Sequence, residues 1–231
     1  MTTESHEPLA GADTIHVTVG DAPRVTVVIL HGYAMRAADL VPFARSLGVA
    51  GEFYFPEAPL DAERVGRAWW PIDQERRAEA MAVGPRDLFR EHPDGLEAAR
   101  SLLHDVVGAI AARHAGAPLV LVGFSQGGML ACDALLRGTV RADGLALLSS
   151  SRIAADEWAE HAVRLRGLPV LVSHGERDPD LGFATGIALR DFCEEAGAVV
   201  TWLPFPGGHE IPLVVWRGVR RLLSTIAARG V

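Results

Sequence analysis

The chain has 231 residues, 49% of them hydrophobic, which suits one large domain with a core covered on both faces. Its formal net charge of −7 argues against binding nucleic acid through the phosphate backbone. No apolar run approaches the length of a membrane span, and the polar N-terminus does not resemble a signal peptide. We therefore expect a cytoplasmic protein without stable membrane insertion.

The pattern along the chain predicts an α/β fold. Residues 1–12 are expected to form a flexible tail and residues 13–231 a single domain. Apolar runs typical of buried strands recur, and helical patterns separate most of them. The runs cover residues 14–19, 25–30, 51–55, 119–122, 144–148, 169–172 and 199–203. The clearest helical patterns cover 96–110 and 215–226, and residues 129–136 are also helix-like. This alternation predicts a mostly parallel sheet with helices on both faces, and we expect the first two strands to form an antiparallel hairpin at one edge.

Residues 56–95 interrupt this alternation. The segment is rich in proline and contains one short helical stretch, over residues 74–82. A connection this long in a compact domain is usually functional, but it is too short for a large cap domain. The two cysteines, Cys132 and Cys193, lie inside helical patterns and are expected to be buried free thiols in a reducing compartment.

The sequence Gly123-Phe124-Ser125-Gln126-Gly127 joins an apolar run to a helical pattern. G-x-S-x-G in that context forms a sharp, strained turn that lifts the serine hydroxyl clear of the sheet. Gly123 and Gly127 lie two residues either side of Ser125, where a Cβ would collide with a neighbouring element. The motif predicts Ser125 as a nucleophile at a helix N-terminus, where backbone N–H groups favour an anion.

A serine nucleophile needs a base and an acid that orients the base. In this fold class they follow in the chain order serine, acid, histidine. Asp178 occupies the acid position in a loop after a later strand, with Asp180 and Glu176 as alternatives. His209 follows the next strand and precedes the last helix. Because an imidazole titrates near neutral pH, His209 is the expected base.

The developing oxyanion needs hydrogen-bond donors. One is expected to be the backbone N–H of Gln126, directly after the nucleophile, and the other to come from the loop after an early strand. In that loop Tyr33 is the first choice and Gly32 the second. Two other histidines at strand ends, His31 and His174, are expected to be structural.

The wall of an acyl pocket is predicted to include Trp69, Trp70, Met35 and Met129. Core packing explains each of these side chains equally well. No cluster of histidine and acidic residues has the spacing of metal ligands, so neither a metal nor another cofactor is expected.

Four motifs in order resemble the phospholipase/carboxylesterase family, which includes acyl-protein thioesterases and small bacterial carboxylesterases of the α/β-hydrolase fold. They are Leu30-His31-Gly32, Gly123–Gly128, His174-Gly175-x-x-Asp178 and Gly207–Pro212. The resemblance spans roughly residues 25–215, and the segments 56–59 and 69–73 look like the family's acyl-site lining. It implies a Ser125, Asp178 and His209 triad with Tyr33 and Gln126 as oxyanion donors. The chain departs from the family after Gly32, where members commonly have a second glycine and a small polar residue.

The leading hypothesis is a serine hydrolase that cleaves small-molecule carboxylic esters, or thioesters, of short or medium acyl chains through an acyl-enzyme on Ser125. It would act as a monomer or homodimer. The alternatives are a dienelactone-hydrolase-like enzyme or a peptidase on the same fold, and a non-catalytic binding protein. The first typically uses a cysteine nucleophile and the second a larger cap.

Overall fold

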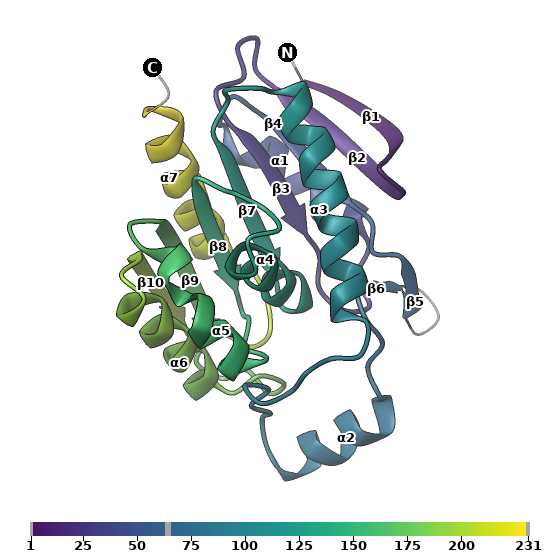
Figure 1. Cartoon of the computed structure of the whole chain (residues 1–231), viewed down its shortest axis with the longest axis vertical. Helices are drawn as coiled ribbons and strands as arrows, with labels where there is room; N and C mark the ends of the chain where they lie inside the picture. Colours follow the sequence, from purple (N-terminus) through teal and green to yellow (C-terminus); the bar gives the residue numbers. More distant parts are fainter. Residues whose placement is uncertain (1, 63–65, 230–231) are drawn as a thin grey trace.

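The computed structural model describes residues 2–62 and 66–229, so the first residue of the predicted tail, positions 63–65 of the long connection and the last two residues lie outside the described part. Its centre is an eight-stranded sheet in the order β1-β2-β4-β3-β7-β8-β9-β10, with β1 and β10 at the two borders (Figure 1). The strands are β1 (Thr2–Leu9), β2 (Ala12–Val19), β3 (Thr26–Leu30), β4 (Gly51–Pro56), β7 (Leu119–Phe124), β8 (Gly144–Leu148), β9 (Pro169–Gly175) and β10 (Val199–Phe205).

Every neighbouring pair from β4 to β10 is parallel, as the alternation of strands and helices predicted. All residues of β3, β7 and β8 are buried, which explains their continuous apolar runs. The carboxyl ends of these parallel strands meet at one edge of the sheet, and the motif that contains Ser125 follows β7 there.

The N-terminal edge differs from the prediction in two ways. The expected flexible tail forms strand β1, which pairs antiparallel with β2 from Thr2↔Val19 to Leu9↔Ala12. Most of its side chains are polar and exposed, so backbone hydrogen bonds hold it without a hydrophobic pattern that could reveal it. An antiparallel edge hairpin is present, but β1 and β2 form it. The predicted pairing of β2 with β3 is wrong because β4 lies between them.

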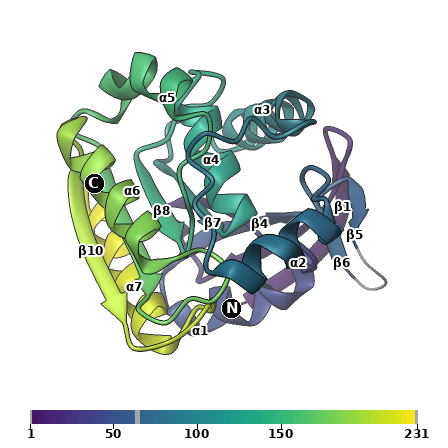
Figure 2. The same ribbon diagram turned by 90° about the horizontal axis from the view of Figure 1, so that it is seen from below.

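Helices cover both faces of the sheet (Figure 2). One core layer includes side chains of α1 and α7, and the other includes side chains of α3, α4, α5 and α6. The helices are α1 (Val41–Leu47), α2 (Gln74–Val83), α3 (Leu96–Arg113), α4 (Gln126–Leu136), α5 (Ala155–His161), α6 (Phe183–Glu195) and α7 (Leu213–Ala227), with short 3₁₀ helices η1 (Ala37–Asp39) and η2 (Ala162–Leu165).

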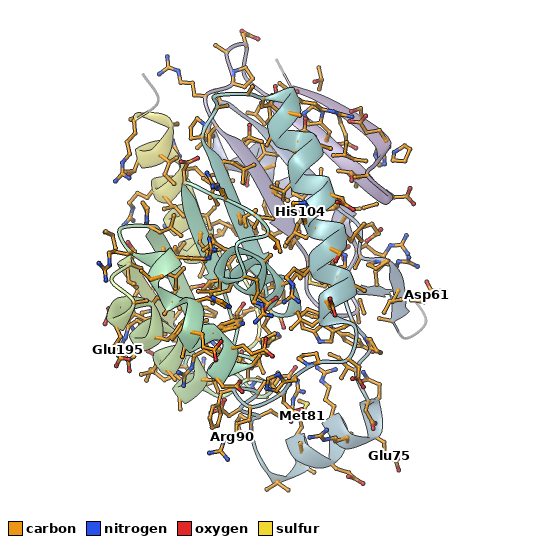
Figure 3. The ribbon with its side chains drawn as sticks, in the orientation of Figure 1. Asp61, Glu75, Met81, Arg90, His104 and Glu195 are labelled. Atoms are coloured by element: carbon orange, nitrogen blue, oxygen red, sulfur yellow. The ribbon has the colours of Figure 1, made fainter. Side chains whose placement is uncertain are left out.

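The long connection contains a small antiparallel pair, β5 (Leu60–Ala62) and β6 (Gly66–Ala68), followed by α2. The helix begins after Asp73, whose side chain accepts the N–H of Arg76 and caps the first turn. It has no buried residue, and Figure 3 shows Glu75 pointing away from the body of the protein. In Figure 1 the helix lies at the end of the molecule opposite the two termini.

Both cysteines are free and buried, as predicted. Burial raises the pKa of Cys193 to about 12, and that of Cys132 is also raised, so both thiols are protonated and unreactive at neutral pH. In the described part of the chain, none of the helices has the length and apolarity needed to cross a membrane.

Candidate active site

Ser125 occupies a strained turn between β7 and α4. Its backbone has φ 51° and ψ −118°, a region that non-glycine residues rarely adopt and that costs roughly 1–3 kcal/mol. Two hydrogen bonds hold the turn: the N–H of Ser125 donates to the carbonyl of Leu148 at 2.8 Å, and the hydroxyl of Ser150 donates to the carbonyl of Ser125 at 3.1 Å. The neighbouring strand β8 therefore fixes the serine at the carboxyl edge of the sheet.

The motif's glycines are required by close backbone contacts. A Cβ on Gly123 would lie 2.4 Å from the carbonyl oxygen of Gly127, and one on Gly127 would lie 2.4 Å from that of Leu30. Both distances are far below van der Waals contact, so neither position accepts a side chain without a backbone shift. The second contact brings the start of α4 against the end of β3.

Ser125, His209 and Asp178 form a continuous chain of hydrogen bonds. Nε2 of His209 lies 2.9 Å from Oγ of Ser125, and Nδ1 of His209 lies 2.7 Å from Oδ2 of Asp178. Since Nδ1–H donates to the carboxylate, Nε2 is left to accept the serine proton. The loop between β10 and α7 carries His209, whose ring centroid lies 4.9 Å from that of Phe124.

Asp178 is buried and held at both carboxylate oxygens. Its Oδ1 accepts the backbone N–H groups of Asp180 and Leu181, each at 2.9 Å, while Oδ2 faces His209 and, at 3.4 Å, Nε2 of His174. Burial by itself raises the pKa of Asp178, but the hydrogen bonds from His174 and His209 outweigh it and hold the pKa well below its usual range. The group is therefore ionised and fixed in orientation at neutral pH.

The alternative acids have other environments. Glu176 is exposed, and Asp180 accepts hydrogen bonds from Arg77 and Arg86. The two histidines expected to be structural are fully buried and bind backbone. Nδ1 of His31 donates to the carbonyl of Gly32 at 2.8 Å, and Nε2 of His174 donates to that of Leu181 at 2.8 Å.

The two predicted oxyanion donors lie beside Ser125. Gln126 is the first residue of α4, so its N–H is one of those without an acceptor inside the helix. A Cβ on Gly32 would lie 3.3 Å from that of Ser125, which places the loop containing Tyr33 directly against the serine. Strand β6 holds this loop, because Arg67 accepts from the N–H of Ala34 and donates to the carbonyl of Met35, both at 2.9 Å. That Tyr33 and Gln126 bind an oxyanion stays a prediction.

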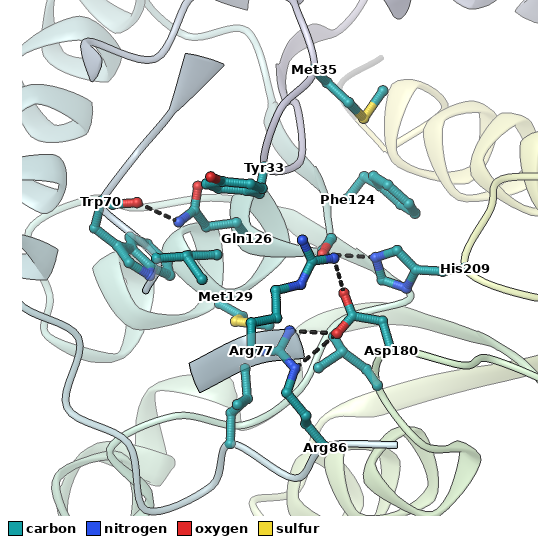
Figure 4. A pocket seen from close by; sticks show the side chains of 14 residues that line it. Tyr33, Met35, Trp70, Arg77, Arg86, Phe124, Gln126, Met129, Asp180 and His209 are labelled. Carbon is teal, nitrogen blue, oxygen red and sulfur yellow. Dashed lines mark hydrogen bonds and ion pairs between the residues drawn. The ribbon is translucent and has the colours of Figure 1, made fainter. Parts of the chain in front are cut away.

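A cavity of about 100 Å³ opens onto Ser125 and His209 (Figure 4). Three of the predicted acyl-wall residues line it, namely Trp70, Met35 and Met129. Trp69 is not among the residues that line this cavity: it is buried in the hydrophobic core, where Nε1–H donates to the carbonyl of His31 at 2.9 Å.

Sequence reasoning missed the polar wall of the cavity. Arg77 and Arg86, both from the long connection, line it together with Asp180. Nη2 of Arg77 lies 2.7 Å from one oxygen of Asp180, and Nε of Arg86 lies 2.8 Å from the other. The length of the connection was the one available signal, since no motif surrounds either arginine.

Among the described residues, one group has side chains suited to ligating a metal. Ligand atoms of His16, Glu52 and His114 lie within 4.8 Å of one another near the amino end of β4, at the opposite end of the sheet from Ser125. The two imidazoles are already engaged, His16 with Glu52 and His114 with the hydroxyl of Tyr54, each at 2.7 Å. The group therefore has a structural explanation that needs no metal.

Two fungal proteins, each named acyl-protein thioesterase 1, are similar in sequence. The chain is 27% identical over 164 residues to the one from Neurospora crassa and 29% identical over 167 residues to the one from Gibberella zeae. Each match covers 67% of this chain and 64% or 66% of the relative, so it spans slightly less than two thirds of the relative's length.

Solved structures share the fold over almost the whole chain. A carboxylesterase from Mesorhizobium loti superposes with a TM-score of 0.76 at 22% identity, covering 96% of this chain and 98% of its own. Esterase PE8 superposes with a TM-score of 0.74 at 23% identity, covering 97% of this chain and 99% of its own. The family model described as Phospholipase/Carboxylesterase matches residues 16–226. The chain belongs to the phospholipase/carboxylesterase family, as its four motifs predicted.

Proposed function

We propose that the protein is a serine hydrolase that cleaves carboxylic esters, and thioesters, of short or medium acyl chains. The observation that carries the proposal is the hydrogen-bond chain from Ser125 through His209 to Asp178, with distances of 2.9 and 2.7 Å, at the wall of a cavity. A hydroxyl, an imidazole and a carboxylate in this order are the parts of a catalytic triad, whatever the fold that holds them.

In the first half of the reaction, Oγ of Ser125 attacks the carbonyl carbon while Nε2 of His209 takes its proton. Asp178, ionised at neutral pH, stabilises the imidazolium and keeps its tautomer and orientation. The tetrahedral oxyanion accepts hydrogen bonds from the backbone N–H groups of Tyr33 and Gln126. Loss of one such donor costs on the order of 10²–10³ in kcat in other serine hydrolases.

The tetrahedral intermediate collapses as His209 returns its proton to the leaving alcohol or thiol. This leaves an acyl group on Ser125. A water molecule then enters, His209 takes its proton, and the same donors stabilise the second oxyanion. Release of the carboxylic acid restores the serine hydroxyl.

Two observations support the substrate class. The cavity of about 100 Å³ is small beside the roughly 300–1,000 Å³ of drug-sized ligand sites, which favours short acyl groups. The fungal relatives are named thioesterases, which supports thioesters as substrates beside oxygen esters.

The two buried free cysteines suit a reducing compartment, and we place the enzyme in the cytoplasm on that ground.

A fluorophosphonate probe tests the nucleophile directly. The intact protein should be labelled, and peptide mapping should place the label on Ser125. In parallel, para-nitrophenyl esters of graded chain length and the matching thioesters should be hydrolysed by wild type. Ser125→Ala should lose several orders of magnitude in turnover, on the order of 10⁶ as in another serine triad. Equal turnover by the two proteins would exclude the mechanism and favour a binding protein.

A further inference from the structure

The cavity over Ser125 holds one more positive than negative charge in its polar wall. Arg77 comes from α2 and Arg86 from the loop that follows, and the single carboxylate of Asp180 accepts hydrogen bonds from both. Burial alone raises the pKa of Asp180, but the hydrogen bonds from the two arginines outweigh it and lower that pKa. Asp180 is therefore ionised at neutral pH, and the wall combines its single carboxylate with two guanidinium groups.

The two arginines differ in how fully they are engaged. Arg86 donates from Nε and Nη2 to the same oxygen of Asp180, and its backbone N–H donates to the Asp180 carbonyl at 2.7 Å. Arg77 gives only Nη2 to Asp180. Its Nε–H is buried and has no acceptor among the residues that the structure describes. Because Nε is closed to solvent, the donors that Arg77 retains for a further partner are the Nη hydrogens that Asp180 does not use, whereas Arg86 serves to hold Asp180.

The guanidinium of Arg77 lies inside the cavity. Its Cζ is 5.7 Å from the ring centroid of Tyr33, and its side chain is 24% exposed. Figure 4 shows the side chain extending across the cavity toward Asp180 and His209. A purely apolar acyl chain that filled this space would desolvate the guanidinium and leave the donors that Asp180 does not use without an acceptor, which is costly. A carboxylate would instead match the two-pronged donor geometry of a guanidinium.

We propose that this site prefers esters with a carboxylate a few bonds from the scissile carbonyl, and that Arg77 binds that carboxylate. The inference rests on the proposed hydrolase function and adds a substrate class to it. The small cavity favours a compact anion close to the ester bond. The carboxylate belongs either to the acyl part, as in a half-ester of a short dicarboxylic acid, or to the leaving alcohol, as in an acylated hydroxy acid.

Two substrate pairs of nearly equal shape test the preference and separate these sources. Monoethyl succinate against ethyl levulinate places a carboxylate or a methyl ketone on the acyl side. Butyryl lactate against butyryl acetoin places a carboxylate or a methyl ketone on the leaving alcohol. For each pair, the quantity measured is the ratio of kcat/KM for the carboxylate ester to that for the ketone ester. The ratio cancels any general effect of a variant on the enzyme.

In at least one pair, the wild-type ratio should be tenfold or more, and Arg77→Gln should reduce it by roughly 10- to 100-fold, the usual effect of losing a charge-assisted hydrogen bond. Arg77→Lys, which keeps the positive charge but loses the two-pronged donor geometry of the guanidinium, should give an intermediate ratio. Arg76→Gln is the matched control. Arg76 neighbours Arg77 on α2, is 72% exposed and pairs with Glu91, so its removal should leave the ratio unchanged.

Two results would overturn the proposal. The first is a wild-type ratio at or below one in both pairs. The second is an unchanged ratio in Arg77→Gln, even with lower rates on all four esters, because Arg77 would then only tie α2 to Asp180. Failure of the hydrolase function itself is seen separately, as equal hydrolysis by wild type and Ser125→Ala.

Discussion

The side chain of Gln126 binds the backbone of Trp70, where Nε2 donates to the Trp70 carbonyl at 2.9 Å. The other end of the same amide, Oε1, accepts the N–H of Trp69 at 2.9 Å. The residue that follows the proposed nucleophile therefore satisfies two buried backbone groups in the long connection. This contact ties the strained turn at Ser125 to the wall of the cavity.

Replacing Gln126 by Met should destabilise the protein by about 2 kcal/mol or more, because a buried donor and a buried acceptor each lose a partner. Urea unfolding measures this loss. Gln74→Met is the control, since Gln74 is exposed and bonds the hydroxyl of Tyr33 at 2.6 Å, and it should change stability by no more than about 0.5 kcal/mol. Equal unfolding midpoints for the two variants would contradict the role assigned to Gln126.

Two glycine-to-alanine changes should have opposite effects. Gly127→Ala puts a Cβ within 2.4 Å of the Leu30 carbonyl oxygen and should destabilise the fold by roughly 1–3 kcal/mol while displacing Ser125. Gly108 lies within α3, and a Cβ there would have nothing within 4 Å, so Gly108→Ala should gain about 0.5–1 kcal/mol. Thermal unfolding of both variants checks the signs. A Gly127→Ala protein as stable as wild type would show that the backbone can move apart here.

Asp178→Asn should reduce kcat by about four orders of magnitude, as the equivalent change does in another serine triad, because the amide favours the wrong imidazole tautomer. The fold should persist, since the amide carbonyl can still accept the N–H groups of Asp180 and Leu181. Ester hydrolysis under saturating substrate measures the effect, with circular dichroism as the check on folding. A loss of less than tenfold would argue that another carboxylate orients His209.

The lowered pKa of Asp178 also affects stability in acid. At pH values below about 4, the unfolded chain protonates this carboxyl more readily than the folded chain does. The contribution of ionised Asp178, paired with His209, to the free energy of unfolding is therefore complete above that pH. It declines as the pH falls toward the folded-state pKa of Asp178. Unfolding free energies of Asp178→Asn should fall less steeply than those of wild type as pH decreases from about 4 to 2. Parallel curves for the two proteins would refute this contribution.

His31 should make the protein less stable in mild acid. Burial lowers its pKa, against the opposing effects of its hydrogen bond to Gly32 and of the Glu57 charge. In the unfolded chain the imidazole gains a proton near pH 6.5, while the folded chain resists protonation. Stability should thus decline as pH drops below about 6.5, and His31→Asn should flatten that decline. His114, whose pKa burial also lowers, contributes in the same direction, so His31→Asn should reduce the slope without abolishing it.

The order of Ser125, Asp178 and His209 could be read from the sequence because each residue follows a strongly apolar strand in a parallel sheet. Such strands place their carboxyl ends at one edge, so chain order translates into proximity. The geometry of the glycine turn could be anticipated for the same reason, since G-x-S-x-G requires a close approach of strand and helix.

Contacts without a hydrophobic pattern could not be predicted. Strand β1 is held by backbone hydrogen bonds and exposes polar side chains, and the position of β4 between β2 and β3 depends on pairing between distant segments. Arg77 and Asp180 are separated by 103 positions, and nothing local to either residue indicates the other. Trp69 shows the same limit, because an aromatic residue beside a pocket and one in the core have the same sequence signal.

The two border strands of the sheet, β1 and β10, contain residues that hinder pairing with a strand of another molecule. Pro8 lies in β1 and Pro204 in β10, and proline has no N–H to offer an incoming strand. Charged side chains also line β1, where Glu4 pairs with Arg45 and Glu7 with Arg113. The unpaired backbone groups along these two strands are thereby poor templates for pairing with another polypeptide, and this disfavours fibril growth by edge-to-edge extension of the sheet.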